Sequence, residues 1–535
     1  MATVSLGRNG GPALAVARGP RRAARVGLAV ASGLVLASAF PPLDLEFLGW
    51  IGLVPLLLAC RGLGSWAAFG TGWLGGAVFY LAIVYWVAHT ISAYSAVPFA
   101  LAVAILLLMV SVLACYTGAF TAGVAWLEAR SLPVVWLAPP LWVVLEWLRS
   151  WFFIGFPWAA LGYSQYRYHD LAQMAEVTGV YGISAVLVLF NVVAVAVLGE
   201  RGPGLRRLVP ALVVLTLLVT VLPLAGRRRA AALAGRASGH VRIALAQGNV
   251  EQDHKWDPAY QDETLARYRQ LTRAAVAAHP DLIVWSETAT PFFFQEPGQL
   301  RQDLLDLAAE SRAYLLFGSP AYRQSPSGTL QELNRAYLVS PDGREVATYD
   351  KIQLVPFGEY VPFQSVLFFV QRLVVAIGDV VPGLEPTVFQ LPAGRFGVLI
   401  CYEDIFPALT RRFVAGGADF LVNVTNDAWF GRTSAPYQHL AQATLRAVEN
   451  RVPLVRVANT GISAVVEPDG RIRWQGPLDQ ALEHVDEIAW PGVRTFYTRF
   501  GDVFAWACAL VTAGALAVGV VRRSGRSLAA HRRFS

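Results

Sequence analysis

The sequence predicts a polytopic α-helical membrane domain of about eight spans joined to an α/β domain. The chain of 535 residues is 55% hydrophobic and only 15% charged, with a mean hydropathy of +0.45. That composition is too apolar for a soluble protein of this length. Between about 240 and 490, in contrast, short β-branched runs alternate with helical patterns, which is typical of an α/β domain.

Apolar runs separated by short breaks account for the membrane domain. Seven lie within 26–225 and one lies near the C-terminus: 26–42, 46–60, 66–88, 96–127, 133–148, 177–198, 208–225 and 501–521. A bilayer core needs about 20 helical residues, so the first two runs are short for a span. Residues 1–25 then form a basic N-tail and 522–535 a basic C-tail. A cleavable signal peptide ending near Ala37-Ser-Ala39 is an alternative interpretation of the start.

The distribution of arginine orients these spans. The N-tail, Arg61, Arg130, Arg201 and the C-tail fall on one side, which the positive-inside rule makes cytoplasmic. Both termini are therefore predicted to be cytoplasmic, and the region from about 226 to 500 extracytoplasmic. Without the ten arginines of the two tails the net charge of +7 becomes −3. The basic balance thus reflects the tails and indicates no nucleic-acid surface.

The α/β domain is predicted over 240–490. Its expected strands are 241–246, 281–285, 314–318, 396–400, 419–424 and 454–457, and its expected helices are 259–278, 299–312, 405–416 and 436–450. Pro-Asp-Gly turns at 341–343 and 468–470 each join β-rich flanks, which favours antiparallel hairpins. The domain is therefore predicted to contain a mixed sheet with covering helices, and it is long enough for a core of its own.

Three strand ends in this domain finish on a reactive side chain. Glu287 follows the strand at 281–285, Lys351 follows the hairpin strand that ends at Tyr349, and Cys401 follows the strand at 396–400. Function in α/β folds concentrates where strands end, so a base, a cation and a nucleophile at these points belong together. Taken singly, each also has an ordinary structural interpretation, as a turn carboxylate, a solvated lysine or a small core residue. Together they indicate a cysteine-dependent acyl-group enzyme.

The residues around this trio resemble a known family. Glu287-Thr-Ala-Thr-Pro291, Lys351 eight residues before Glu359, and Cys401-Tyr-Glu-Asp404 are similar to the Glu-Lys-Cys signature of the nitrilase superfamily of carbon–nitrogen hydrolases. The resemblance covers 240–490 and implies an αββα sandwich. It also assigns supporting roles to three further residues: Glu359, Tyr402 and Glu403.

The expected chemistry is acyl transfer through a thioester. An ordinary thiol is mostly protonated at neutral pH, so Cys401 needs a base or a nearby cation. Glu287 is the predicted base, and Lys351 is the predicted cation beside the carbonyl oxygen of the tetrahedral intermediate. The same site would then serve a second, aminolysis step in a ping-pong cycle.

The membrane domain narrows the resemblance further. Seven spans before and one span after such a domain, together with Lys255-Trp256, Pro356–Pro362 and Asn426–Gly431, resemble the apolipoprotein N-acyltransferase family. This implies the bacterial cytoplasmic (inner) membrane, a phospholipid donor of the phosphatidylethanolamine type, and the α-amine of an S-diacylglyceryl-cysteine apolipoprotein as acceptor, in the last step of lipoprotein maturation. Trp256 and Trp429 match family positions on mobile loops at the mouth of the site, although an aromatic packed over a sheet edge is the alternative.

Neither a cofactor nor a metal is expected, because no pair of the eight histidines has ligand spacing beside cysteines or carboxylates. The sequence is also compatible with two other functions. A membrane-anchored amidase would use the same trio to hydrolyse a small amide, but simple anchoring needs one span and not eight. A transporter or scaffold would carry ionisable groups in its spans, where Glu146 is the main candidate.

Overall fold

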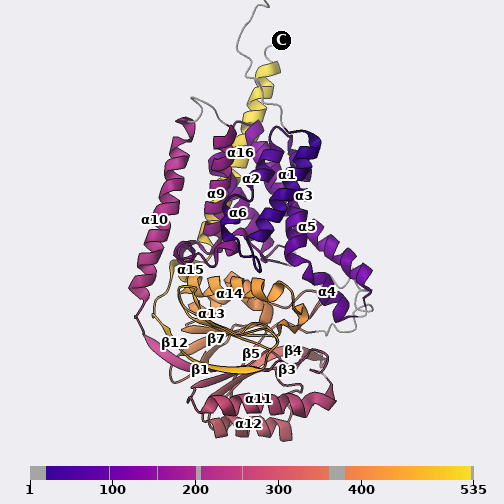
Figure 1. The fold of residues 1–535 in the computed structure, drawn as a ribbon, viewed down its shortest axis with the longest axis vertical. Helices are drawn as coiled ribbons and strands as arrows, with labels where there is room; N and C mark the ends of the chain where they lie inside the picture. Colours follow the sequence, from indigo (N-terminus) through magenta and orange to yellow (C-terminus); the bar gives the residue numbers. More distant parts are fainter. Residues whose placement is uncertain are drawn as a thin grey trace, which may run out of the picture.

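The computed structural model describes residues 20–95, 97–152, 155–199, 206–255, 257–360 and 380–531. A helical part occupies one end of the molecule and an α/β sandwich the other (Figure 1). Helix α10 leads down to the first strand of the sandwich, and α16 returns from the sandwich into the helical part (Figure 1).

Each of the eight predicted apolar runs contains helix. The helices of this part are α1 (Arg22–Ser38), α2 (Val54–Cys60), α3 (Ser65–Val84), α4 (Trp86–Ala93), α5 (Phe99–Ala129), α6 (Val134–Arg149), α9 (Val180–Gly199), α10 (Val209–Leu233) and α16 (Val503–His531), with the short α7 (His169–Ala172) and α8 (Ala175–Thr178). Among the described residues, α3, α5, α9, α10 and α16 are long and apolar enough to cross a membrane. The chain is therefore a membrane protein, and α1, α2 and α6 are shorter.

The ends of the helical part differ from the expected ones. Helix α1 begins at Arg22, inside the predicted N-tail, and α16 continues to His531, through most of the predicted C-tail. Apolar periodicity marks only the stretch that packs or meets lipid, whereas a helix continues into polar sequence wherever no helix-breaking residue stops it.

Small residues bring the first helices of the membrane part together. A Cβ on Gly33 of α1 would overlap the backbone of α3 at Gly75 and Phe79, and one on Gly72 of α3 would overlap Thr121 of α5. The Thr121 hydroxyl donates to the Ala68 carbonyl of α3 at 2.8 Å. Close backbone approach through glycine and threonine is a common way for helices to associate in lipid.

The α/β part consists of two six-stranded sheets. One has the order β12-β1-β2-β3-β4-β5 and the other the order β11-β10-β9-β8-β7-β6. The strands of the first sheet are β1 (Gly239–Gln247), β2 (Leu282–Trp285), β3 (Tyr314–Gln324), β4 (Leu330–Val339), β5 (Glu345–Asp350) and β12 (Leu482–Trp490). Those of the second are β6 (Val388–Gln390), β7 (Arg395–Ile400), β8 (Phe420–Thr425), β9 (Leu454–Ala458), β10 (Ala464–Val466) and β11 (Ile472–Gln475).

The two sheets stack between two layers of helices. Helices α11 (Gln261–Val276) and α12 (Gln299–Ser311) cover the outer face of the first sheet, while α13 (Pro407–Ala415) and α14 (Ala435–Asn450) lie between the second sheet and the membrane part (Figure 1). Strand β1 shows the alternation that this requires: Ile243 packs in the core shared with the second sheet, and Ala244 in the core under α11 and α12. The αββα sandwich is confirmed.

The connections agree with the predicted turns. The Pro-Asp-Gly sequence at 341–343 joins the antiparallel pair β4 and β5, and that at 468–470 joins the antiparallel pair β10 and β11. Both sheets are mixed, because β1, β2 and β3 run parallel and so do β7, β8 and β9. The carboxyl ends of β2 and β7, which carry Glu287 and Cys401, therefore open toward loops and not toward tight hairpins.

Polar contacts join the sandwich to the membrane part. Trp158, which lies in the segment between α6 and α7, donates its indole N–H to Gln438 Oε1 of α14 at 2.8 Å. Glu449 at the end of α14 accepts from the backbone N–H of Val180, the first residue of α9, at 3.1 Å. The buried Arg451 contacts Glu176 of α8 at 2.8 Å. The sandwich is thus fixed against one face of the helical part.

Candidate active site

Cys401 follows β7 directly and begins the 3-10 turn η5 (Cys401–Ile405). Its φ is +52°, a left-handed conformation that residues other than glycine rarely adopt. The residue is only 6% exposed. Strain of this kind persists where the surroundings hold it in place, and Glu403 of the same turn supplies much of that support.

Glu403 ties the turn of the cysteine to the segment after β5. Its Oε2 accepts from the backbone N–H of Ile400 at 2.8 Å. Its Oε1 accepts from the backbone N–H groups of Ile352 and Gln353, at 2.7 and 3.0 Å, and from the Tyr349 hydroxyl at 2.8 Å. Burial raises the pKa of Glu403 to about 7, although the backbone donors Ile400 and Gln353 oppose the shift. The carboxylate serves as an anchor for the turn.

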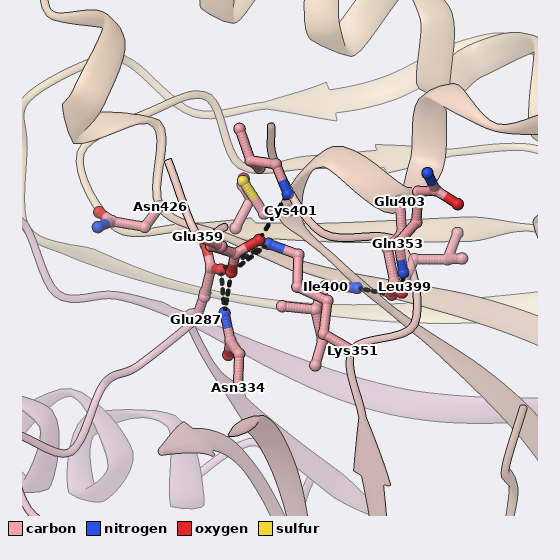
Figure 2. Close-up of polar contacts among 12 residues, drawn as sticks. Glu287, Asn334, Lys351, Gln353, Glu359, Leu399, Ile400, Cys401, Glu403 and Asn426 are labelled. Atoms are coloured by element: carbon pink, nitrogen blue, oxygen red, sulfur yellow. Dashed lines mark hydrogen bonds and ion pairs between the residues drawn. The ribbon is translucent and has the colours of Figure 1, made fainter. Parts of the chain in front are cut away.

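Glu287, Lys351 and Glu359 form one charged cluster, which we call the carboxylate–lysine cluster (Figure 2). Lys351 Nζ lies 2.9 Å from Glu359 Oε1 and 3.4 Å from Glu287 Oε1. Asn334 of β4 donates through Nδ2 to the same two oxygens, at 3.0 Å to Glu359 and 2.8 Å to Glu287. Figure 2 shows these side chains meeting beside Cys401. The fold thus brings together the four predicted residues.

The second oxygen of Glu287 has a different environment. Glu287 Oε2 is buried, and among the residues that the structure describes it has no hydrogen-bond partner. Buried carboxylate oxygens are almost always hydrogen-bonded. An oxygen without a partner beside a thiol is the arrangement that proton abstraction needs, because the lone pairs that would take the proton are not already engaged.

Burial and the charges around Cys401 determine the protonation states of the Cys401 thiol and of Lys351 in the absence of substrate. Burial raises the pKa of the Cys401 thiol, Glu287 raises it further, and Lys351 lowers it. For Lys351, burial lowers the pKa, but Glu359 and Glu287 outweigh burial and raise it overall. The resting site therefore holds a neutral thiol next to a firmly charged ammonium. Activation of the thiol requires proton transfer to a base, and Glu287 is the carboxylate whose charge acts most strongly on Cys401.

The other predicted residues lie at the boundary with the membrane part. Tyr402 is buried, and its hydroxyl is 3.5 Å from the carbonyl oxygen of Gly155, in the segment that follows α6. Trp429 is half-buried, and its ring packs edge-on against Tyr94, with 5.0 Å between centroids, just after α4. Its carbonyl accepts from Thr90 of α4 at 2.9 Å. Trp256 lies outside the described residues.

A second buried charged group, which we call the Arg456 network, lies behind the turn. Arg456 donates to Asp404 Oδ2 at 2.7 Å and to Asp427 Oδ2 at 2.8 Å. His439 Nε2 is 2.7 Å from Asp404 Oδ1. All four side chains have no solvent exposure. They connect η5 to the loop of Trp429, and they cannot be recognised from the sequence because they come from four separate segments.

Two residues of the site carry no clear signal in the sequence. Asn334 bridges both carboxylates of the carboxylate–lysine cluster, yet it is a single polar residue inside a strand. Lys255 donates to the backbone carbonyl of Glu287 at 2.9 Å, and the sequence places it only within a family motif. Residues that are distant in the chain and adjacent only in the folded protein produce no periodic pattern in the sequence.

Comparisons with known proteins cover nearly the whole chain. Residues 32–193 match the family model of the apolipoprotein N-acyltransferase N-terminal domain, and residues 242–481 match that of carbon-nitrogen hydrolase. A curated apolipoprotein N-acyltransferase of Geobacter metallireducens is 43% identical over 502 residues, 93% of this chain and 95% of the relative. One of Azotobacter vinelandii is 34% identical, with 93% of this chain and 95% of the relative covered. Among solved structures, Saccharomyces cerevisiae Nit3, of the nitrilase superfamily, has a TM-score of 0.37 and 21% identity, with 47% of this chain and 91% of that chain covered.

Proposed function

This chain belongs to the apolipoprotein N-acyltransferase family and is an acyltransferase, and from that premise we propose the substrates, the residue roles and the orientation of its site. The proposed donor is a membrane phospholipid of the phosphatidylethanolamine type. The proposed acceptor is the free α-amine of an S-diacylglyceryl-cysteine at the N-terminus of an apolipoprotein. The names of the relatives support the class of acceptor, and the long apolar helices support a donor taken from the bilayer.

In the first half-reaction the thiol of Cys401 becomes acylated. Its sulfur bonds to the ester carbonyl carbon of the donor while Glu287 takes the thiol proton. The carbon–oxygen bond to the lysophospholipid then breaks, and Glu287 returns the proton to that oxygen. Lys351 faces the carbonyl oxygen, where negative charge develops in the tetrahedral intermediate. The Oε2 of Glu287, for which the described part of the chain supplies no hydrogen-bond partner, supports this assignment.

In the second half-reaction the acceptor amine attacks the thioester. The amine nitrogen bonds to the carbonyl carbon, the carbon–sulfur bond breaks, and the amine proton passes through Glu287 to the sulfur. Because the same residues serve both steps, the cycle is ping-pong. Glu359, 2.9 Å from Lys351 in the free site, is proposed to orient the ammonium group in both steps. Trp429 and Trp256 are proposed to border the mouth of the site, where apolar cover would keep water from the thioester.

The orientation of the chain is part of the proposal. We place 26–225 and 501–521 in the cytoplasmic membrane, residues 240–490 as the catalytic domain on the extracytoplasmic side, and both basic tails, 1–25 and 522–535, in the cytoplasm. The excess of arginine in the tails and in loops on one side supports this placement. Cysteine labelling from either side of sealed vesicles would test it.

The observation that carries the proposal is the pairing of a buried cysteine, a free carboxylate oxygen and a lysine in a chain with membrane-crossing helices. The test is intact-protein mass spectrometry of detergent-purified protein after incubation with a defined phosphatidylethanolamine, in parallel with Cys401→Ala. We expect one added acyl mass on the unmodified chain, none on the variant, and discharge by a diacylglyceryl-cysteine peptide. A folded protein that forms no adduct would overturn the phospholipid donor and favour an amidase.

A further inference from the structure

The chain uses lysine at only two positions. Its 44 basic residues comprise 42 arginines and the two lysines Lys255 and Lys351. At every other position where the chain has a lysine or an arginine, the residue is therefore an arginine. The two lysines stand apart, since lysine and arginine differ in size, in number of donors and in their ability to lose the proton.

Both lysines contact the same residue. Lys351 Nζ lies 3.4 Å from the Glu287 carboxylate, and Lys255 Nζ donates to the Glu287 backbone carbonyl at 2.9 Å. Lys255 is 3% exposed and Lys351 1% exposed. The two lysines of a 535-residue chain thus converge on the proposed base from two different segments.

The two ammonium groups are balanced differently. Lys351 forms ion pairs with both Glu287 and Glu359. For Lys255, no carboxylate lies within ion-pair distance among the residues that the structure describes; its ammonium group donates to a neutral carbonyl. A buried cation without a directly paired anion is unfavourable unless a negative charge elsewhere in the site compensates it.

The sum of the charges around Cys401 indicates which negative charge Lys255 compensates. Glu287, Glu359 and Lys351 together carry one net negative charge, and transfer of the thiol proton to Glu287 moves that charge onto Cys401 and the bound acyl group without changing its total. We propose that Lys255 is the second cation of the catalytic site and that its charge offsets the negative charge which develops at Cys401 during acylation. The inference rests on the proposed function for the meaning of that charge, and it assigns Lys255 as a positioning and charge-balancing residue.

The electrostatics of Lys255 agree with this role. Burial lowers its pKa to about 8, while the negative charges of Glu287 and Cys401 raise it. Those two residues are the titratable groups that face it, one from the loop after β2 and one from η5. Lys255 is therefore charged at neutral pH and neutral in mild alkali, whereas Lys351 stays charged. Arginine at this position would remain charged at every accessible pH.

A matched pair of variants separates charge from hydrogen bonding. Lys255→Gln keeps an N–H donor for the Glu287 carbonyl and removes the charge, and Lys255→Arg keeps the charge. Arg267→Gln is the control, because Arg267 donates to the nearby Asn249 carbonyl at 2.8 Å and pairs with Glu263. The readout is the rate at which iodoacetamide alkylates Cys401 in the full-length, detergent-purified chain, followed by peptide mass spectrometry from pH 6 to 10, together with acylation by phosphatidylethanolamine.

We expect Lys255→Gln to alkylate at least about tenfold more slowly than the unmodified chain at pH 7.5, which corresponds to a thiol pKa raised by about one unit. Arg267→Gln should match the unmodified chain. Lys255→Arg should retain more of the rate than Lys255→Gln and should lose less of it above pH 8. A Lys255→Gln variant that is folded and alkylates at the unmodified rate would overturn the inference.

A second measurement keeps the inference testable if the variants fold poorly. Because the chain has two lysines, labelling the unmodified chain with [ε-¹³C]lysine gives two side-chain signals, and titration separates them because Lys351 stays charged. The Lys255 signal should titrate near pH 8; a lysine signal that is already neutral at pH 7 would refute the inference. Alkylation needs no lipid, so a failed phospholipid assay with an intact Lys255 effect would refute only the donor.

Discussion

Glu403 accepts a hydrogen bond at 2.8 Å from the backbone N–H of Ile400, the residue immediately before the proposed nucleophile Cys401. The same carboxylate accepts from three more donors: the Tyr349 hydroxyl of β5 and the backbone N–H groups of Ile352 and Gln353, which follow β5. The turn that presents Cys401 is therefore held by a carboxylate of its own first turn, which reaches back to the residue before the cysteine. This relationship makes Glu403 a structural requirement for the geometry of the thiol.

Glu403→Gln should disrupt this turn. Glutamine has one acceptor oxygen, and its amide nitrogen would face backbone N–H groups that also donate. Leaving one or two buried donors unpaired should lower the free energy of unfolding by about 1–3 kcal/mol each. Acylation of Cys401 should fall by more than tenfold, measured by intact mass. A variant as stable and as active as the unmodified chain would show that the anchor is dispensable.

Glu359→Gln should impair acylation more than it impairs folding. Without Glu359, Lys351 keeps only the Glu287 carboxylate as an ionic partner, so the ammonium should move toward the base and away from the carbonyl oxygen. We expect the rate of acyl-enzyme formation to fall by about 10²-fold or more, within the range seen when a single stabilising group is lost. Glu345→Gln, which breaks only the ion pair with Arg301 at the sandwich surface, is the control and should leave the rate unchanged.

Gly318→Ala should displace Glu287, the proposed base, because β3 packs directly against the backbone of Glu287 and Thr288. A Cβ at Gly318 of β3 would lie 2.9 Å from Glu287 Cα and closer still to the backbone nitrogen of Thr288. Neither backbone atom can move without moving Glu287, so we expect a loss of about 1–3 kcal/mol in stability and a clear fall in acylation. Gly298→Ala is the matched control, because nothing lies within 4 Å of its Cβ. Equal acylation by the two variants would contradict the prediction.

Arg456→Met should destabilise the whole sandwich. The substitution leaves Asp404 and Asp427 buried without their shared cation, and removal of one partner from a buried ionic group costs about 3–5 kcal/mol. The midpoint of thermal unfolding in detergent should fall accordingly. Arg471→Met, which removes an exposed ion pair with Asp469, should change stability by less than about 1 kcal/mol. A small effect at Arg456 would mean that the network is not needed for folding.

The pH dependence of stability should differ between the unmodified chain and Lys255→Gln. The pKa of Lys255 is lowered to about 8 in the folded chain, whereas an unfolded lysine titrates near 10.4. Between these values the unfolded chain holds more protons, so the contribution of Lys255 to stability rises with pH, by at most about 1.4 kcal/mol per pH unit. The difference in stability between the two proteins should therefore change from pH 8 to pH 10 and stay constant below pH 7. The same proton loss should slow acylation.

Much of the sandwich could be predicted because its strands are buried on both faces. The run 396–400 reads as a strand and forms β7, and the helix expected at 436–450 is α14 at Ala435–Asn450. Strand β12, in contrast, is not predicted: its nine residues are mostly polar or half-exposed. It exists because β1 offers an edge to pair with, and a partner supplied by tertiary structure leaves no mark in the strand's own composition.

The sequence by itself determined the membrane character and an α/β domain with a mixed sheet, because apolar length and strand periodicity are local properties. Its resemblance to a known family added the prediction of the αββα class and of a site formed by Glu287, Lys351 and Cys401. Tertiary structure decided the positive φ of Cys401, the anchoring of its turn by Glu403, the bridge from Asn334 and the convergence of both lysines on Glu287. Those features depend on distances between segments far apart in the chain. Close packing and the pairing of buried polar groups set such distances, and neither acts until the two sheets have come together.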